Sequence, residues 1–336
     1  MTRPTMADVA EVAGVGMKTV SRVVNGEGKV SAATRQRVEA AIAETGYRRN
    51  EIARSMRAGQ RSMDIGLLLG DLTNPFFASV ASAVIAVSRS WGYRVVLSSA
   101  DEDPEAELAA IEALLGRQVA GLMVVPGAED YSRLQTDVDR GTPVVFIDRP
   151  GGGLVADEVV IDNAAGARMA VRHLVSHGHE RIGIVVAPSR WATAERLRGY
   201  REAMENELGG VDESLISILG HGSVVDAEDA ARTLLALPDP PTAIFATTGF
   251  VTQGLVRALG SSHDTALVGF DDFPMADLLA VPITVVAGDP RELGTVAAQV
   301  LFDRIAGSRD EPSRRIVQPR LIIRGSGELP PRGRRR

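Results

Sequence analysis

Residues 5–25 read TMADVAEVAGVGMKTVSRVVN, and this stretch decides the fold of the N-terminal part of the chain. Thr5 followed three residues later by Asp8 is typical of a capping box, which predicts a helix over about 6–13. Gly14 suits the turn that ends this helix, and a second helix is expected over about 17–24. The stretch therefore predicts two short helices joined by a glycine turn.

The second of these helices is polar on one side, as a helix that enters the major groove of DNA must be. We expect Met17, Lys18 and Arg22 to read base edges. The alternative for Lys18 is a phosphate contact, which positions a protein on DNA without reading its sequence. The residues expected to bind phosphates are Thr5, Thr19, Ser21, Asn25, Ser31 and Thr34.

A third helix completes this head. Ser31 is expected to cap a helix over about 32–45, and Gly46 to close it. Residues 50–57 suit a short fourth helix that is too short to be stable in isolation. Residues 58–62 form a polar linker to the rest of the chain.

The charge is unevenly distributed along the chain. Residues 1–63 hold 11 lysines and arginines against 6 aspartates and glutamates, whereas all 336 residues together carry a net charge of −6. A basic head on an acidic body fits a nucleic-acid-binding module attached to a domain that does not bind DNA. There is no cysteine, which excludes disulfides and Cys-ligated metal sites. We see no signal peptide and no apolar run near the ~18 residues of a membrane helix, so we expect a cytoplasmic protein without a membrane partner.

From Asp64 onward, apolar strands alternate with helices, a pattern typical of parallel sheets that are covered on both faces. We expect two lobes, with the break after Ile161-Asp162 and a ligand crevice outside the carboxyl ends of the strands. The predicted strands are 64–69, 93–98, 120–125, 143–147, 158–161, 181–186, 214–219, 242–246, 265–269, 283–286 and 316–323.

Residues 5–57 resemble the headpiece of the lactose repressor (LacI/GalR) family of bacterial transcription regulators. The matching motifs in the head are Asp8-Val9-Ala10, Ala13-Gly14-Val15, Thr19 to Asn25, Val30-Ser31, Thr34-Arg35, Gly46-Tyr47 and Ala53 to Met56. The matching motifs in the body are Asn74 to Phe77, Ile147-Asp148-Arg149, Ile161-Asp162-Asn163, Gly178-His179, Glu195 to Tyr200, Val268 to Asp272 and Arg324-Gly325-Ser326. The resemblance covers nearly the whole chain.

The resemblance implies an all-α helix-turn-helix headpiece with a hinge helix, followed by a two-lobed α/β domain like that of periplasmic binding proteins, with parallel sheets. We expect the headpiece over 1–48 and the hinge helix with its linker over 49–62. The N-lobe is expected over 63–161 plus 291–320, and the C-lobe over 162–290 plus 321–329. Residues 330–336 are expected to form a disordered basic tail.

The resemblance also implies a homodimer on a pseudo-palindromic operator in double-stranded DNA, with hinge residues Asn50, Ala53 and Met56 at the minor groove. Met56 stands where the family usually has leucine, and a flexible thioether can still wedge between base steps. Gly16 replaces the usual serine that caps the second helix, which weakens that cap by only a few tenths of a kcal/mol. Arg48-Arg49 stands where a proline often precedes the hinge asparagine.

For the effector, the resemblance points to side chains at strand ends and near the start of the C-lobe. A set of aspartates and an arginine suits a hydroxyl-rich ligand such as a sugar, because carboxylates accept from paired hydroxyls and a guanidinium donates. The alternatives are a loop cap for Asp148 and a surface ion pair with Glu195 or Asp226 for Arg196; the aromatic residues are equally suited to packing over the crevice. The expected effector-binding residues are Asn74, Phe76, Asp148, Trp191, Arg196, Thr248, Asp271 and Phe273.

Three departures from the family pattern bear on the ligand. Thr247-Thr248-Gly249 stands where the family typically has an Asn-Asp pair. Gly288 lies where a polar residue often reaches the pocket, and Gly222-Ser223 where an aromatic residue often stacks. We therefore expect a pocket that is wider or less polar on the C-lobe side, which makes a larger sugar or a ligand other than a sugar credible.

His173, His177 and His179 have a spacing that would allow metal binding, but Gly178 ends their helix, and cationic side chains are common at helix C-termini. We expect no metal site. The sequence has no phosphate loop, nucleophile elbow or NAD fingerprint, so we expect neither a cofactor nor catalytic residues.

We therefore interpret the chain as a sequence-specific transcriptional regulator, a repressor that a small-molecule effector releases from DNA. One alternative is a regulator that requires a corepressor such as a purine. A second is a solute-binding protein of the same two-lobed fold, and a third is an α/β enzyme that has acquired a DNA-binding head.

Overall fold

The computed structural model describes residues 4–28, 30–47, 62–100, 103–188, 191–260 and 264–331. They fall into two compact units, a headpiece within Met1–Ser62 and a body within Met63–Arg336. Among the described residues, no helix is long and apolar enough to cross a membrane.

The headpiece holds three short helices, as predicted. The capping box is confirmed, because the amide of Thr5 donates to Asp8 Oδ2 at 2.6 Å and the amide of Asp8 donates to Thr5 Oγ1 at 3.4 Å. Gly14 ends the first helix in the left-handed region, at a φ of 60°, which glycine adopts without strain. The helices are α1 (Met6–Ala13), α2 (Met17–Val24) and α3 (Ala32–Thr45).

The core of the headpiece is small. A guanidinium also links α3 to the end of α1, because Arg37 Nη2 donates to the carbonyl oxygens of Ala13, at 2.6 Å, and Gly14, at 3.1 Å. This contact satisfies carbonyl groups at the C-terminus of α1 that have no partner within the helix. The buried residues are Val9, Ala10, Ala13, Val20, Val23, Val38 and Ala41.

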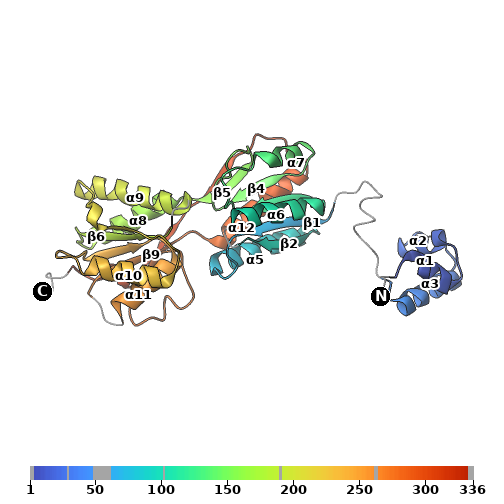
Figure 1. Cartoon of the computed structure of the whole chain (residues 1–336), viewed down its shortest axis with the longest axis horizontal. Coiled ribbons are helices and arrows are strands. Elements are labelled where there is room, and N and C mark those ends of the chain that lie inside the picture. Colours follow the sequence, from blue (N-terminus) through green and yellow to red (C-terminus); the bar gives the residue numbers. More distant parts are fainter. Residues whose placement is uncertain are drawn as a thin grey trace. The chain divides into compact units, whose positions relative to one another are not determined.

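The body contains two six-stranded sheets (Figure 1). The first has the order β11-β5-β4-β3-β1-β2, and every neighbouring pair is parallel. Its four inner strands are buried along most of their length, which explains their largely apolar sequence, whereas its two edge strands are exposed or half-buried over most of theirs. They are β1 (Asp64–Leu69), β2 (Arg94–Ser99), β3 (Gly121–Val124), β4 (Val144–Ile147), β5 (Asp157–Ile161) and β11 (Arg314–Val317).

The second sheet has the order β12-β10-β9-β8-β6-β7, in which only the edge strand β12 is antiparallel to its neighbour. It repeats the topology of the first sheet with a different edge. Its strands are β6 (Ile182–Val186), β7 (Ile216–Ile218), β8 (Ala243–Ala246), β9 (Ala266–Phe270), β10 (Thr284–Ala287) and β12 (Arg320–Ile322).

Helices cover both faces of each sheet (Figure 1). In the first sheet, α5 (Pro75–Ser90) and α12 (Pro290–Ile305) share one face, and α6 (Pro104–Gly116) lies on the other. A short helix, α7 (Gln135–Asp139), precedes β4.

In the second sheet, α8 (Asn163–Ser176) and α9 (Trp191–Leu208) pack together on one face. Gly199 makes their contact close, because a Cβ there would lie 2.3 Å from the carbonyl oxygen of Ala164. The other face is covered by α10 (Val224–Leu235) and α11 (Gly249–Leu259).

The strand predicted over 316–323 is wrong as a single strand. Val317 ends β11 in the first sheet, and Arg320 begins β12 in the second sheet. Pro319 separates them, and a proline has no amide hydrogen to continue a ladder. The chain consequently passes between the sheets three times, after β5, after β10 and after β11.

Candidate functional site

The helix α2 carries the side chains that were expected to meet DNA. It buries Val20 and Val23 in the headpiece core, while Met17 is 59% exposed and Lys18 is also exposed. Positions i, i+1, i+4, i+5 and i+8 share one side of a helix. On that side the structure brings together Met17, Lys18, Ser21, Arg22 and Asn25.

The partners of these side chains within the headpiece are local. Asn25 Nδ2 donates to Ser21 Oγ at 3.3 Å, and Arg22 Nε lies 3.9 Å from Glu27 Oε2. The side chains of Arg22 and Glu27 are both well exposed, so this ion pair contributes little to stability. Thr19 is half-buried beside them.

The other predicted phosphate-binding residues sit at helix starts. Thr5 caps α1, and Ser31 caps α3 by accepting from the amide of Thr34 at 3.3 Å. The hydroxyls of Ser31 and Thr34 are 2.9 Å apart. Their role at phosphates stays a prediction. The expected hinge contacts Asn50, Ala53 and Met56 lie outside the described residues.

In the body, two aspartates occupy equivalent positions in the two sheets. Asp148 follows β4 and Asp271 follows β9, and their φ angles of 71° and 70° lie in the left-handed region. The amide of Asp148 donates to the carbonyl of Val159 at 2.9 Å, and that of Asp271 to the carbonyl of Val286 at 2.8 Å. Non-glycine residues adopt this conformation rarely, and such residues gather at functional sites.

Arg196 on α9 joins the strand ends of the second sheet. Its side chain is buried, and its Nε donates to Asn163 Oδ1 at 2.8 Å. Its Nη1 donates to the carbonyl oxygen of Thr247 at 2.5 Å and to Asp271 Oδ2 at 3.1 Å. The guanidinium also lies 3.6 Å from the centre of the Phe270 ring. These contacts fix the guanidinium in one orientation.

The carboxylate of Asp271 is incompletely satisfied. Its Oδ1 is buried without a hydrogen-bond partner among the described residues, although its side chain as a whole is 20% exposed. Burial raises the pKa of Asp271, and the negative charge of Asp148 raises it further, while Arg196 lowers it. A buried acceptor without a donor is costly, so this oxygen is suited to accept from a ligand.

The remaining predicted effector residues line strand ends and helix starts. Asn74 follows β1 and caps α5 by accepting from the amide of Phe76 at 3.0 Å. Thr248 follows β8 and caps α11 through the amide of Val251. Phe76 is half-buried and packs edge-on against its neighbour Phe77. Trp191 and Phe273 are half-buried, and whether they stack on a ligand stays a prediction.

Among the described residues, Arg196 does not form the alternative surface ion pair with Glu195 or Asp226. Glu195 pairs with Arg198 and Asp226 caps its own helix with Ser223, so neither holds Arg196. The Asp148 carboxylate lies 3.4 Å from Arg149 Nε.

Sequence reasoning missed Asn163 and Thr247 as partners of Arg196. The hydroxyl of Thr247 is fully buried, donates to the carbonyl of Val185 at 3.0 Å and accepts from the amide of Ala187 at 2.9 Å. The missed signal was position, because Thr247 directly follows β8 in the second sheet and Asn163 begins α8, just after β5 of the first sheet. The absence of a side chain at Gly288 leaves no extra space there, since a Cβ at this position would lie 2.5 Å from the side chain of Ile161. An apolar side chain fills that space.

The three histidines have separate structural partners. His173 Nε2 contacts Glu328, and His177 Nδ1 lies 2.8 Å from the carbonyl oxygen of His173. The ring of His179 bridges Thr242 Oγ1 at 2.9 Å and the carbonyl of Leu329 at 2.8 Å, and its burial lowers its pKa. Within the described part of the chain, no group of three potential ligands could hold a metal ion.

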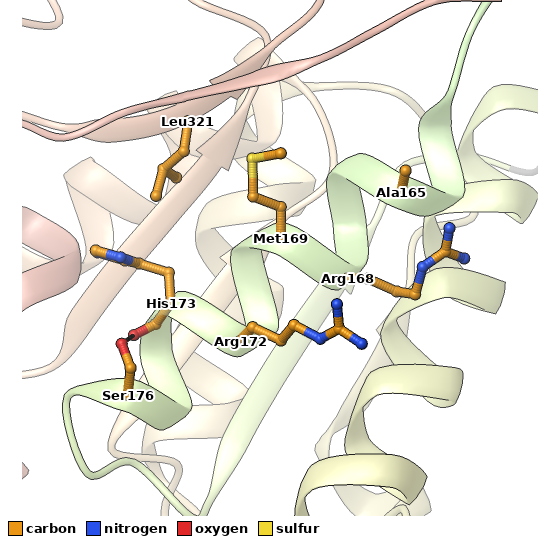
Figure 2. A pocket seen from close by; sticks show the side chains of 7 residues that line it. All are labelled: Ala165, Arg168, Met169, Arg172, His173, Ser176 and Leu321. Carbon is orange, nitrogen blue, oxygen red and sulfur yellow. Dashed lines mark hydrogen bonds between the residues drawn. The ribbon is translucent and has the colours of Figure 1, made fainter.

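An open pocket lies along α8 (Figure 2). Its charged rim is neutralised within the chain, because Arg168 pairs with Glu202 at 2.7 Å and Arg172 with Glu207 at 3.0 Å. The pocket does not include the Arg196–Asp271 pair. Its lining residues are Ala165, Arg168, Met169, Arg172, His173, Ser176 and Leu321.

Two family models match this chain. Residues 5–50 match the model described as bacterial regulatory proteins, lacI family, and residues 171–327 match the model described as periplasmic binding protein-like domain. The regulator CelR of Thermobifida fusca is 34% identical over 340 residues, covering 97% of this chain and 98% of CelR.

Solved structures agree with these matches. A complex of the transcriptional regulator CelR with cellobiose has 32% identity and a TM-score of 0.69, and it covers 96% of this chain and all of that chain. The lac repressor dimer bound to operator and the anti-inducer ONPF has 26% identity and a TM-score of 0.77, covering 97% and 99%. Each of these proteins is named as a regulator or repressor, and none as an enzyme.

Proposed function

The chain belongs to the lacI family of bacterial regulatory proteins and is a DNA-binding transcriptional regulator, and from this premise we propose how it reads DNA and what releases it. We propose a repressor that binds a pseudo-palindromic operator through α2 and is released when a hydroxyl-rich small molecule binds the body. It would act in the cytoplasm, where its operator is. The lobe boundaries predicted above, 63–161 plus 291–320 and 162–290 plus 321–329, are part of this proposal.

On the DNA side, the proposal rests on the open face of α2. Met17 and Lys18 stand at the first turn of this helix, which is the part of a recognition helix that contacts base edges. Lys18 supplies a donor for the acceptor edge of guanine, and Met17 supplies apolar contact for a thymine methyl group. Arg22, one turn later, is suited to either a base or a phosphate.

Exposed apolar side chains support the proposal of a homodimer. Met275 and Leu278, between β9 and β10, are 64% and 72% exposed. Val225 on α10 in the same sheet unit is also well exposed. Met275 and Leu278 lie one turn apart, with the amide of Leu278 donating to the carbonyl of Met275, and adjoining exposed apolar side chains mark surfaces that a partner covers. A second copy of the chain is the partner that a two-fold symmetric operator requires.

The effector proposal rests on one observation, the buried Oδ1 of Asp271 that no donor among the described residues reaches. Arg196 and Asp271 together offer a donor and an acceptor, and Asp148 adds a second acceptor close enough to repel Asp271. Vicinal hydroxyls of a sugar can donate to both carboxylates and accept from the guanidinium. Cellobiose, the ligand of the CelR complex, is therefore the first sugar to test.

A ligand between Asp148 and Asp271 would change the balance between two conformations of the body. Without a ligand the two carboxylates repel each other, whereas hydroxyls that donate to both reduce that repulsion. A ligand shifts the equilibrium only by its difference in affinity for the two states. Release requires that the ligand favour the conformation with the lower operator affinity, and operator DNA must then weaken ligand binding by the same factor, because the coupling between two sites is reciprocal.

The experiment is a selection of random duplexes by the full chain at two salt concentrations, followed by sugar titrations on the recovered DNA. We expect one near-palindromic motif whose binding weakens with salt, by a log–log slope of about −0.9 per neutralised phosphate. Cellobiose or another sugar in a panel of mono- and disaccharides should release the protein. A sugar or purine that instead tightens binding would establish a corepressor, and recovery of no motif would contradict the proposal.

A further inference from the structure

We propose that Asn163 is the positioning residue that orients Arg196 and connects the Arg196–Asp271 pair to the segments that join the two sheets. The inference rests on the proposed function, because it concerns how an effector bound at that pair alters the body. Asn163 does not need to touch the effector. It acts through Arg196.

Asn163 is held from both ends of its amide. It is only 1% exposed, its Oδ1 accepts from Arg196 Nε at 2.8 Å, and its Nδ2 donates to the carbonyl oxygen of Ile161 at 3.2 Å. An asparagine both donates and accepts, which an aliphatic side chain cannot do and a carboxylate does only in part. The side chain therefore joins a guanidinium on α9 to the backbone at the end of β5.

Asn163 binds the backbone at Ile161, and the three passages between the sheets meet beside this residue. The first passage runs through Asp162, whose amide donates to the carbonyl of Val317, at 3.1 Å, where the third passage begins. The second passage contains Gly288, which packs so closely on Ile161 that a Cβ would lie 2.5 Å from it. A movement of the backbone at Ile161 would consequently displace all three passages.

The guanidinium of Arg196 gives this connection its stiffness. A buried cation is stable only where its donors are satisfied, and Arg196 divides its bonds among Asn163, Thr247 and Asp271. An effector that donates to Oδ1 of Asp271 draws negative charge away from the carboxylate whose Oδ2 accepts from Arg196, and so weakens that contact. A shift of Arg196 would then pull on Asn163, and through it on the end of β5. Asn163 thus transmits effector binding to the passages.

The first test needs no effector. Because the chain has no cysteine, spin labels can be placed at Thr136→Cys on α7 and Asn206→Cys on α9, both exposed positions, one beside each sheet. We expect Asn163→Ala to broaden the distribution of distances between the labels relative to the otherwise unaltered labelled chain. Ser326→Ala is the matched control, because Ser326 is a buried polar residue whose hydroxyl donates to the carbonyl of Leu267 on β9 and accepts from the amide of Thr284 on β10, both in the second sheet. An unchanged distribution in Asn163→Ala, or an equal broadening in the control, would overturn the proposal.

The second test measures coupling with the sugar that releases the unaltered protein, starting with cellobiose. In Asn163→Ala we expect the release factor at saturating sugar to fall at least fivefold, from a coupling that is typically 5–150-fold. Asn163→Asp keeps an acceptor for Arg196 but cannot donate to Ile161. It should therefore bind the sugar within about threefold of the unaltered affinity and still lose coupling.

The outcomes separate this inference from the proposed function. If no sugar acts on the unaltered protein, the effector proposal fails, and the label distances alone decide the role of Asn163. If the sugar releases the unaltered protein and both Asn163 variants keep full coupling, the effector site stands and the inference is wrong. Should Asn163→Ala not fold, Asn163→Asp and its label distances serve for both tests.

Discussion

On α2 of the headpiece, the side chains expected to meet DNA are close in sequence and open to solvent, whereas the Arg196–Asp271 pair of the body joins residues 75 positions apart and is largely buried. The contacts of the first group are made within one helix, such as Asn25 with Ser21. Those of the second group come from α9, from the start of α8 and from the ends of β8 and β9.

The difference concerns how function and stability are connected. A side chain on the open face of α2 can be changed with little effect on folding, because its contacts within the chain are local and exposed and the partner proposed for it is DNA. A side chain in the Arg196 cluster satisfies buried groups of its neighbours, so changing it affects folding and binding together. This contrast makes predictions that differ in size between the two regions.

The largest effect is expected for Arg196→Met. Removing the guanidinium leaves Asp271 buried without its cation, which costs about 3–5 kcal/mol of unfolding free energy in comparable cases. The oxygens of Asn163 and Thr247 lose their donor as well. Urea unfolding of the full chain would measure this change, and binding of the releasing sugar should be lost with it.

Arg198→Met is the matched control on the same helix. Arg198 is half-exposed and pairs with Glu195 and Glu202 at the surface, so its removal should cost about 0–1 kcal/mol. Equal losses in the two variants would mean that the Arg196 cluster does not differ from a surface ion pair.

The next effect concerns DNA and should leave folding unchanged. Lys18→Ala is expected to remove about 1–3 kcal/mol of discrimination at one base pair of each half-site. Competition between the selected operator and single-base variants would measure it, at two salt concentrations. A uniform loss over all sequences, with a salt slope smaller by about one unit, would show instead that Lys18 contacts phosphate only.

Arg37→Ala provides the opposite case in the headpiece. Its guanidinium donates to the carbonyls of Ala13 and Gly14, so this change should lower the stability of the headpiece and leave base preference unaltered. Hydrogen exchange of amides in α1 would measure the loss.

The same contrast explains what the sequence could predict. The capping box at Thr5, the turn at Gly14 and the open face of α2 depend on residues within a few positions of each other, and the structure contains each of them. The alternation of strands and helices likewise predicted both sheets. Local patterns did not reveal that Pro319 divides the last predicted strand between two sheets.

Long-range contacts lay beyond the sequence patterns. Nothing near Asn163 indicates that Arg196, 33 positions away, will use it as an acceptor. Glycine at position 288 was the reason to expect a pocket that is wider or less polar on the C-lobe side, and the sequence did not indicate that the side chain packed against it is Ile161 on another strand. The shared motifs predicted Arg196 and Asp271 as effector-binding residues, and the two are in contact, whereas the partners that orient them required the fold.

A change of pH is expected to have a smaller effect on the free energy of unfolding, and this effect has opposite signs at two neighbouring residues. Burial raises the pKa of Asp271, so the cost of its charge is full above that raised pKa and is relieved as the pH falls through it. Two hydrogen bonds from Arg324, each 2.7 Å, lower the pKa of Asp272, so its stabilisation is full above about 3.8 and is lost as the pH falls further.

On acidification, the free energy of unfolding of Asp271→Asn should therefore fall relative to that of the unaltered chain. That of Asp272→Asn should rise relative to the unaltered chain. Urea unfolding of the full chain between about pH 2.5 and pH 7.5 would measure both differences. The prediction is wrong if the two variants shift in the same direction, because burial would then not distinguish the two carboxyl groups.

The smallest effect is expected at the start of α2, where Gly16 offers no side-chain cap. A serine fits there, because φ is −70° and no atom lies within 4 Å of the Cβ that it would add. Gly16→Ser should stabilise α2 by a few tenths of a kcal/mol, and Ser31→Gly should destabilise α3 by a similar amount, since Ser31 now accepts from Thr34. Hydrogen exchange of the α2 and α3 amides in the full chain would resolve the two signs. A slower exchange in α2 without any change in the body would confirm that headpiece contacts are local, whereas altered exchange around Arg196 would contradict the contrast between the two regions.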